Sequence, residues 1–262
     1  MSTAADRWEN VDFKSEAEYA GGFNGFGDTS NCMSFGDTGI TVIEQSRWPA
    51  LIEQCQASKS SLSYLVDYVN NQRNEGSCVG NGWMKGFEVK FRQQFGFTVP
   101  MSSISLYNRI GQSSSSGAMV VDGLRELQQR GAVPLDTEVN RGKYPVLMPA
   151  TGFSRRMPGG WEESAKRFKV LEAFTVRGVA EVITCLLNGM PVVVGRDGHC
   201  IVQLEACMRN GKIAAKYVNS WGDWGDAGGN LPSGFGYDTG GALERAAQEA
   251  FAIRSVSKGY VE

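Results

Sequence analysis

The pattern of apolar residues changes about halfway along this 262-residue chain, and this change limits the folds that the chain can adopt. Before about residue 135, apolar residues recur every three or four positions, a spacing typical of helices. Beyond that point come short runs rich in Val and Ile, which favour strands. The sequence therefore predicts an α+β protein in which a mainly helical part precedes a β-rich part.

The helical part is predicted to contain one long helix and three short ones. The long helix runs from Cys78 to about Phe95, and Gly96 follows where a helix ends. One face of this helix is apolar at a spacing of four residues and is expected to pack in the core: Val79, Trp83, Phe87 and Phe91. The shorter helices are expected at Arg47–Ser58, Ser102–Arg109 and Met119–Arg130.

The β-rich part is predicted to contain four strands and one helix. The helix is expected at Val176–Asn188, where apolar spacing ends at Gly189. A tight hairpin turn is expected at Gly195–Gly198, between two of the strands. The strands are expected at Phe168–Phe174, Pro191–Val194, Cys200–Leu204 and Ile213–Val218.

These elements suggest one domain in three segments. Residues 1–58 are predicted to be an N-terminal extension that wraps the body, residues 59–135 a helical lobe and residues 136–262 a β-rich lobe. Glycine is concentrated in residues 21–39 and 222–241, where aromatic residues interrupt it, so these segments are predicted to be loops that pack on the body or mobile segments.

Composition and charge exclude several classes of function. Lys and Arg number 26 against 28 Asp and Glu, so no basic excess indicates a nucleic-acid partner. No run of about 18 apolar residues predicts a membrane span, and the N-terminus lacks the apolar region of a Sec signal. A cytoplasmic or virion-associated location is therefore expected, with six free thiols: Cys32, Cys55, Cys78, Cys185, Cys200 and Cys207.

Three residues, in chain order, can together perform nucleophilic chemistry. Cys78 opens a helix, whose N-terminus lowers the pKa of a thiol. His199 is the only histidine and can act as base and then as acid, while Asn219 can orient its ring. Acyl transfer also needs donors for the developing oxyanion, which the Cys78 N–H and the Gln72 amide can supply, with Gly76 allowing a close approach.

Each of these residues also has a structural interpretation. A cysteine at a glycine-flanked helix start is more often a packing residue, and a single histidine in a hairpin is usually a core or surface residue. Asn-Ser-Trp-Gly alone, at residues 219–222, is typical of a turn. His199 and Cys200 lie near Cys207, but the spacing does not fit zinc and no fourth ligand is close, so no metal or other cofactor is expected.

Taken together, however, the motifs resemble those of the papain family of cysteine peptidases, in its divergent microbial or viral branch. Gln72 stands six residues before the cysteine of Gly76-Ser77-Cys78. The family's histidine motif is matched by 198–200 (Gly-His-Cys) and its asparagine motif by 219–222, with a further Trp-Gly at Trp224-Gly225. The resemblance covers roughly residues 60–225.

The resemblance implies a two-lobe fold with a cleft between a helical lobe and an antiparallel, barrel-like β lobe. It implies that Cys78 is the nucleophile of a thiol protease, His199 the general base and acid, and Asn219 the residue that orients the histidine. Gln72 would be the oxyanion donor, and Gly76 and Ser77 would line the substrate site. Trp221 would shield the bond between asparagine and histidine from water.

The sequence departs from the family at several positions. Arg73 stands where a glycine is usual, and Val79 follows the cysteine in place of an aromatic or small residue. Another register would move the nucleophile position to about Asn81, but it needs an insertion and leaves Gln72 unused. The loop before the histidine, which builds part of the substrate pocket, is reduced to Gly195–Gly198. No typical inhibitory pro-region precedes the domain, although residues 1–45 could cover the cleft.

The sequence leads to three hypotheses. The first is a cysteine endopeptidase, a hydrolase that cleaves peptide or protein substrates through a thioester on Cys78. The second is a papain-fold structural or binding protein, such as a virion or assembly component, with partners bound through the glycine-rich ends. The third is a peptidoglycan amidase or endopeptidase, against which the Asn-Ser-Trp-Gly motif and the long separation of Cys78 from His199 both argue.

Overall fold

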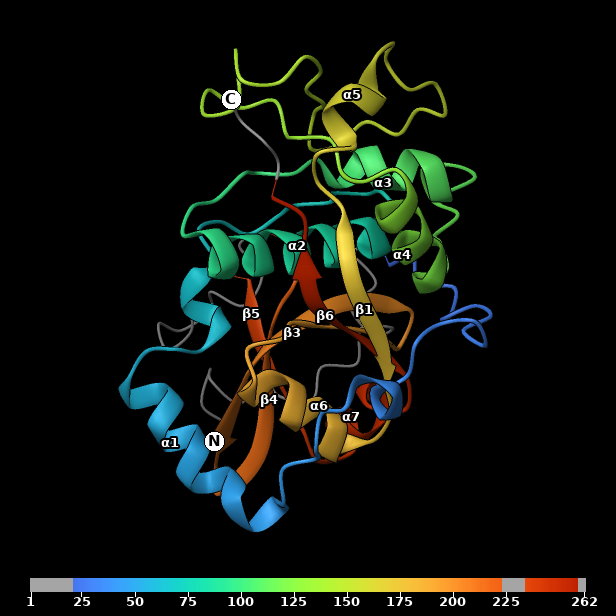
Figure 1. Ribbon diagram of the computed structural model, residues 1–262. Helices are drawn as coiled ribbons and strands as arrows, with labels where there is room; N and C mark the ends of the chain where they lie inside the picture. Colours follow the sequence, from blue (N-terminus) through green and yellow to red (C-terminus); the bar gives the residue numbers. More distant parts are fainter. Residues whose placement is uncertain (1–20, 223–233, 259–262) are drawn as a thin grey trace, which may run out of the picture.

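The computed structural model describes residues 21–222 and 234–258 and has two lobes (Figure 1). Helices make up most of the upper lobe, and a twisted sheet forms most of the lower one, with α2 (Cys78–Phe95) lying along their boundary. The predicted α+β class is confirmed. Trp224-Gly225 and the first twenty residues of the predicted extension lie outside the described residues.

The predicted helices form within one to three residues of their expected ends. Cys78–Phe95 is helical as predicted, and Gly96 ends it in the left-handed conformation at φ 81°, donating its N–H to the carbonyl of Arg92 at 2.8 Å. The other α-helices are α1 (Trp48–Ala57), α3 (Ser103–Ile110), α4 (Val120–Gln129), α5 (Trp161–Ala165), α6 (Val179–Leu187) and α7 (Gly240–Ala246). Short 3-10 helices are η2 (Phe35–Thr38), η3 (Gln45–Arg47) and η4 (Leu62–Leu65).

The strands form one antiparallel sheet in the order β1-β6-β2-β3-β4-β5. Their bounds are β1 (Val170–Val176), β2 (Val192–Arg196), β3 (His199–Arg209), β4 (Lys212–Val218), β5 (Phe235–Thr239) and β6 (Ala250–Val256). In the β2–β3 hairpin, Arg196 pairs with His199, so only Asp197 and Gly198 form the turn, at φ 53° and 79°. The predicted four-residue turn is thus two residues shorter, and its first half belongs to β2.

The C-terminal part of the sheet differs from the prediction. Loops were expected over residues 222–241, but β5 and the start of α7 lie there. At Gly236 a Cβ would collide with the ring of Tyr217 on β4, so the glycine of this strand serves close packing rather than a loop. Strand β6, which lies between β1 and β2, was not predicted, and its residues 250–253 are buried without the alternation that marks a half-exposed strand.

Two apolar cores lie in the molecule, and α2 belongs to the first. Its aromatic stripe packs as predicted, with Trp83 donating its indole N–H to the Val120 carbonyl of α4 at 2.9 Å. Next to this stripe, the helix lies on the sheet through Gly82 and Gly86, where an added Cβ would meet Cys200 and Ile253 at 3.0 and 2.9 Å. The second core fills the other face of the sheet, between its strands and α1, α6 and α7.

Some segments do not pack with the part of the molecule to which their sequence position assigns them. Aromatic residues Tyr144, Trp161 and Phe168 belong to the first core, with α2, whereas α1 packs in the second. The segment boundaries at residues 58 and 135 stay a prediction. Within residues 21–222 and 234–258, no helix combines the length and apolar character that crossing a bilayer requires.

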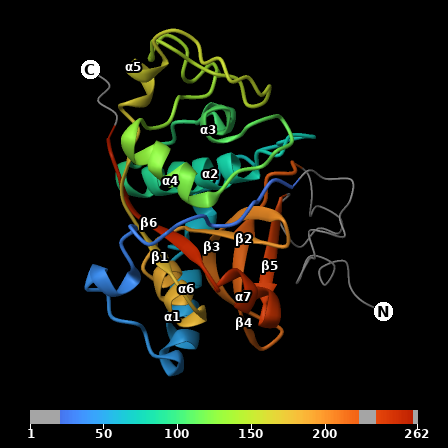
Figure 2. The same ribbon diagram turned by 90° about the vertical axis from the view of Figure 1, so that its right-hand side faces the viewer.

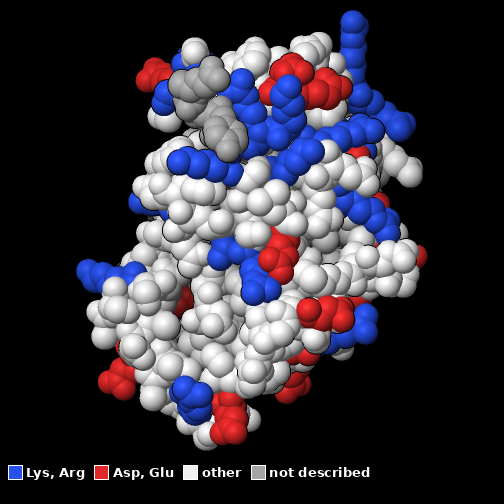
Figure 3. Space-filling view, viewed as in Figure 1, with Lys and Arg blue, Asp and Glu red and all other residues white. Residues whose placement is uncertain are grey.

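Basic side chains gather on the upper lobe even though the net charge of the chain is −2. Figure 3 shows Lys and Arg concentrated in the upper part of the face seen in Figure 1, around α5. Between α4 and β1, the exposed basic residues are Arg130, Arg141, Lys143, Arg155, Arg156 and Lys166. The charge of the surface is therefore uneven, which the total alone does not reveal.

Candidate active site

The start of α2 is fixed by close backbone packing. Ser77 is the N-cap residue and Cys78 the first residue of the helix. The N–H of Gly76 donates to the Ser114 carbonyl at 2.7 Å, and a Cβ on Gly76 would lie 3.0 Å from the Gly117 nitrogen. Glycine at position 76 therefore lets the loop at residues 113–117 approach the helix start, and this contact places Cys78 at the boundary of the lobes.

The thiol of Cys78 lies against the first residues of β3. Its side chain is fully buried, and this burial raises the pKa of the thiol to about 12. Backbone N–H groups of Cys200, Val79 and Cys78 itself lie within hydrogen-bonding reach of the sulfur and lower its pKa against that trend. The contact with Cys200 brings the nucleophile predicted from one lobe beside the residue that follows His199 in the other.

The ring of His199 is held by Asn219, as the resemblance implies. The Nε2 atom of His199 lies 2.6 Å from Oδ1 of Asn219, and this same oxygen accepts the backbone N–H of Ser220 at 2.7 Å. Because the backbone N–H can only donate, the atom it meets is the amide oxygen, and Nε2 of the neutral ring must carry the proton. Nδ1 is then the nitrogen that can accept a proton, as a general base requires.

Burial also keeps His199 neutral. Its side chain is fully buried, which lowers its pKa to about 4; the bond to Asn219 raises the pKa, and the nearby Arg196 charge lowers it further. The indole of Trp221, itself buried, lies over the imidazole with the ring centroids 4.4 Å apart and the planes at 31°. Trp221 therefore lies beside the imidazole, and its shielding role stays a prediction.

Gln72 is joined to the asparagine segment by both its backbone and its side chain. Its N–H donates to the Ser220 carbonyl at 2.8 Å, and its Oε1 accepts the Ser220 hydroxyl at 2.5 Å. This fixes the amide so that Nε2 donates to the Glu75 carbonyl at 2.7 Å and to the Gly21 carbonyl at 3.2 Å. The carbonyl of Gly21 thus stands where the carbonyl of a bound substrate would meet an oxyanion donor.

The segment 21–26, named the strap here, crosses the boundary of the lobes. Figure 2 shows this blue segment running between the helices above and the sheet below. On the sheet side, the N–H groups of Gly22 and Phe23 both donate to the Gly198 carbonyl at 3.1 Å. On the helical side, Gly22 accepts from Ala118 at 2.9 Å and Asn24 donates to Ala118 at 3.1 Å. The strap, which belongs to residues 1–45, therefore lies across the boundary between the two lobes, bonded to both.

A buried charge network lies behind His199 and was not found from the sequence. Arg196, the partner of His199 across the hairpin, donates to Oδ1 of Asp238 at 3.1 and 2.6 Å. The other Asp238 oxygen accepts the Gln203 amide at 2.8 Å. Only the charged residues inside an otherwise apolar hairpin could have pointed to it. Ser220 was also missed, because its bond to Gln72 joins residues 148 positions apart.

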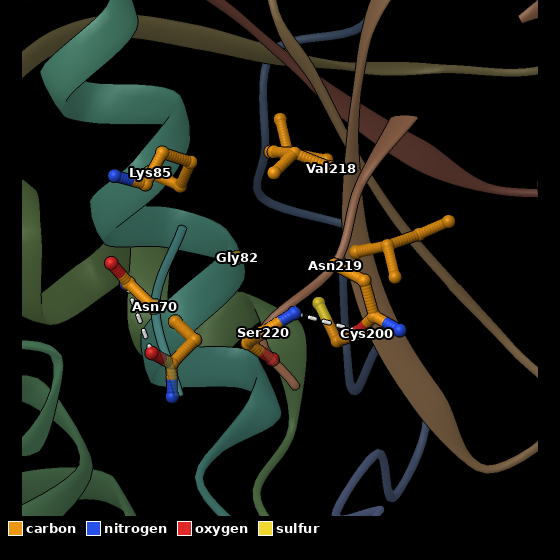
Figure 4. Close-up of a pocket in the computed structure, with 10 residues that line it drawn as sticks. Asn70, Gly82, Lys85, Cys200, Val218, Asn219 and Ser220 are labelled. Carbon is orange, nitrogen blue, oxygen red and sulfur yellow. Dashed lines mark hydrogen bonds between the residues drawn. The ribbon is translucent and has the colours of Figure 1, made fainter. Parts of the chain in front are cut away.

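A small cavity lies beside the site, between α2 and the ends of β3 and β4 (Figure 4). Cys200 and Asn219 border it from the sheet, and Asn70 and Lys85 border it from the helical side. Its volume of about 10 Å³ holds about one water molecule, which is far too little for a polypeptide. A substrate would have to occupy the cleft that the strap now fills.

Comparison with known proteins bears on the fold. No family model matches the sequence, and no curated protein matches it as a relative. Solved structures, however, are similar over most of the chain. Digestive procathepsin L 3 from the larval midgut of Tenebrio molitor has a TM-score of 0.62 at 14% identity, covering 92% of this chain and 78% of its own.

Two further structures extend the comparison across organisms. Xylellain, a cysteine protease from Xylella fastidiosa, has a TM-score of 0.60 at 16% identity, covering 91% of this chain and 97% of its own. Procathepsin B S9 from Trypanosoma congolense has a TM-score of 0.59 at 12% identity, covering 92% of this chain and 88% of its own. The predicted papain-like two-lobe fold is confirmed, and likeness at these identities concerns the fold alone.

Proposed function

We propose that the chain is a cysteine peptidase that hydrolyses peptide bonds through a thioester on Cys78. The observation that carries this proposal is that Cys78 lies against the backbone of Cys200, directly after His199 of the His199–Asn219 pair, while the Gln72 amide already meets a backbone carbonyl of the strap. No single residue of the set would support it, because each alone has a structural interpretation.

The arrangement fits the steps of acyl transfer. Cys78 gives its proton to Nδ1 of His199, and its sulfur attacks the substrate carbonyl carbon. The oxygen that becomes negative is stabilised by the Gln72 amide and the Cys78 N–H. When the C–N bond breaks, His199 returns the proton to the leaving nitrogen. Water, activated by the same ring, then hydrolyses the thioester and restores the thiol.

The described state is a covered one. With the thiol pKa at about 12 and the imidazole pKa at about 4, both groups are neutral near pH 7 and the thiolate–imidazolium pair does not form. Burial is the largest cause of both shifts, so displacing the strap and admitting water would move the two pKa values toward each other. Activity is therefore expected to depend on opening of the strap.

The same observation favours one rival, a papain-fold binding protein that performs no chemistry. The cleft is filled by the chain's own strap and Cys78 is wholly buried, as expected if the site has become structural. In that case the strap would never leave, and the thiol would stay as inert as a core cysteine.

The test is thiol labelling together with hydrolysis. The full chain and its Gly22→Ala variant, in which a Cβ would collide with the Gly76 carbonyl, are treated with a peptidyl epoxide and with a denatured protein substrate. We expect Cys78 to be labelled faster than the half-buried Cys55 in the variant, and Cys78→Ala to abolish hydrolysis while Cys55→Ala leaves it intact.

The outcomes separate the three hypotheses. A Cys78 that is labelled no faster than Cys55 in both proteins, with no hydrolysis, contradicts the peptidase and supports the binding protein. Hydrolysis of purified cell wall without hydrolysis of protein substrates would instead support the peptidoglycan enzyme.

A further inference from the structure

We propose that the cleft admits only glycine on both sides of the reacting carbonyl, followed by an aromatic residue, so that its substrates are polypeptides with a Gly-Gly-aromatic segment. The chain's own Gly21-Gly22-Phe23 occupies these positions as a ligand in cis. The proposal rests on the proposed function and names the substrate class of that same site.

The position of the scissile bond follows from the oxyanion donor. The carbonyl that meets the Gln72 amide belongs to Gly21, so the equivalent substrate bond is the one between Gly21 and Gly22. The nitrogen of Gly22 would be the leaving group. It donates to the Gly198 carbonyl at 3.1 Å, directly before His199, the residue that must protonate it.

The first glycine has no room for a side chain. A Cβ on Gly21 would lie 2.6 Å from the Gly198 carbonyl oxygen. That oxygen also accepts the two N–H groups of Gly22 and Phe23, and it belongs to the tight turn between β2 and β3. Because the obstacle is a backbone atom rather than the end of a flexible side chain, the site cannot adjust to alanine without moving the hairpin.

The second glycine is restricted more strongly. Gly22 has φ of 134°, a conformation that L side chains rarely adopt, and a Cβ there would collide with the Gly76 carbonyl. Gly76 in turn is held against Ser114 and Gly117, next to the start of α2. Two glycines are therefore required by the two walls of the cleft independently, one by the sheet side and one by the helical side.

The third position accepts a large ring. The Phe23 ring packs closely on Gly195 of β2, where an added Cβ would lie only 2.2 to 2.5 Å from three ring carbons, and it meets Phe26 edge to face with the centroids 5.3 Å apart. The absence of a side chain at position 195 therefore makes space for an aromatic residue. The backbone bonds of the strap would form with any sequence, so the available space determines which side chains are accepted.

Peptide binding to a chain without the nucleophile tests the proposal. The full chain carrying Cys78→Ala and Gly22→Ala is titrated with a fluorescent peptide of residues 20–26, AGGFNGF, and with versions having alanine for either glycine of GG or for the first Phe. We expect each change to weaken binding at least about tenfold, which corresponds to 1.4 kcal/mol. Alanine for the later glycine, equivalent to Gly25, should weaken binding less, because that position shares the positive φ (112°) but its Cβ would only touch Met119 at 3.8 Å.

If the alanine peptides bind as tightly as AGGFNGF, the proposal is contradicted. It is also contradicted if AGGFNGF does not bind although alkylation of Cys78 in Gly22→Ala shows that the strap has opened. An unchanged alkylation rate in Gly22→Ala contradicts it too, because the site would then tolerate a Cβ. If Gly22→Ala does not fold, Phe23→Ala with Cys78→Ala is titrated with the same peptides. Selective binding of the peptide, without its hydrolysis by the protein that retains Cys78, would contradict the proposed peptidase activity but still support this inference.

Discussion

The two walls of the cleft are held in different ways. On the sheet wall, side-chain contacts fix the site: His199 is bonded to Asn219 and stacks on Trp221. All three residues lie at or near the ends of β3 and β4. On the helical wall, Cys78 is placed by backbone contacts of Gly76 and is covered by a strap that comes from far along the chain. The difference shows that the proposed base is already held in place, whereas access to the proposed nucleophile is expected to depend on a separate segment of the chain.

The largest effect is expected from a substitution in the sheet wall, at His199. In the Gly22→Ala background, His199→Gln should lower hydrolysis by about 10²–10⁴-fold, because it removes the proton acceptor while leaving a side chain that can still bond Asn219. Rates on a denatured protein substrate measure it, and an Arg141→Gln variant, altered on the upper lobe, is the control. A fall of less than tenfold would mean that the ring takes no part in proton transfer.

The next effect is the pH dependence of folding that this ring causes. The pKa of His199 is lowered from 6.5 to about 4, so below pH 6.5 the unfolded chain takes up a proton that the folded chain refuses. This contribution to stability is present above pH 6.5 and is lost as the pH falls toward 4, by about 3 kcal/mol in all.

Urea unfolding of the wild type and of His199→Gln at about pH 7 and about pH 4 measures this loss as the difference between the two proteins. Since His199 is the only histidine, its proton resonance reports the folded pKa directly. A resonance that titrates near 6.5 would contradict the burial of the ring.

A smaller effect is expected from a substitution that acts on the helical wall. Gly22→Ala should raise the alkylation rate of Cys78 by about tenfold or more, because the strap must leave its place to accommodate the Cβ. Gly25→Ala is the matched control, since Gly25 also has positive φ, 112°, but meets only the flexible Met119. Similar alkylation rates in the two variants would mean that backbone strain, and not the collision, causes the effect.

The smallest effect concerns the bond that joins the walls. Ser220→Ala removes the hydroxyl that Gln72 accepts at 2.5 Å and should reduce the free energy of unfolding by about 1 kcal/mol. Ser58→Ala, which deletes an exposed hydroxyl bonded to the Gln54 carbonyl at 2.8 Å, should cost less. Equal costs in urea unfolding would show that the buried bond has no special role in coupling the lobes.

The elements that carry periodic signals could be predicted from the sequence. The helix at Cys78–Phe95 follows from its apolar spacing and its terminal glycine. The approach of Asn219 to His199 follows from the motifs of the resemblance, and no pattern of spacing alone would have joined them. The roles of Cys78, His199, Asn219 and Gln72 in a reaction stay a prediction.

Other features could not be predicted because their causes lie outside the segments concerned. Nothing in the glycines of the strap says what they meet, and only the Gly198 and Gly76 carbonyls explain them. The first residues of strand β6 carry no alternation because both faces of the strand are covered there. Such contacts can be predicted from one sequence only when the residues on the other side of the contact are known.

The glycine side of α2 has a consequence for the spacing of the lobes. At Gly82 and Gly86, one and two turns after Cys78, the helix contributes no side chain to its contact with the sheet, and the side chains of Cys200 and Ile253 fill the space. A methyl group at either position would lie 3.0 or 2.9 Å from these side chains, so either the side chain or the helix would have to shift. The distance between the helix and the sheet therefore depends on two positions that carry no side chain, in the turns that follow Cys78.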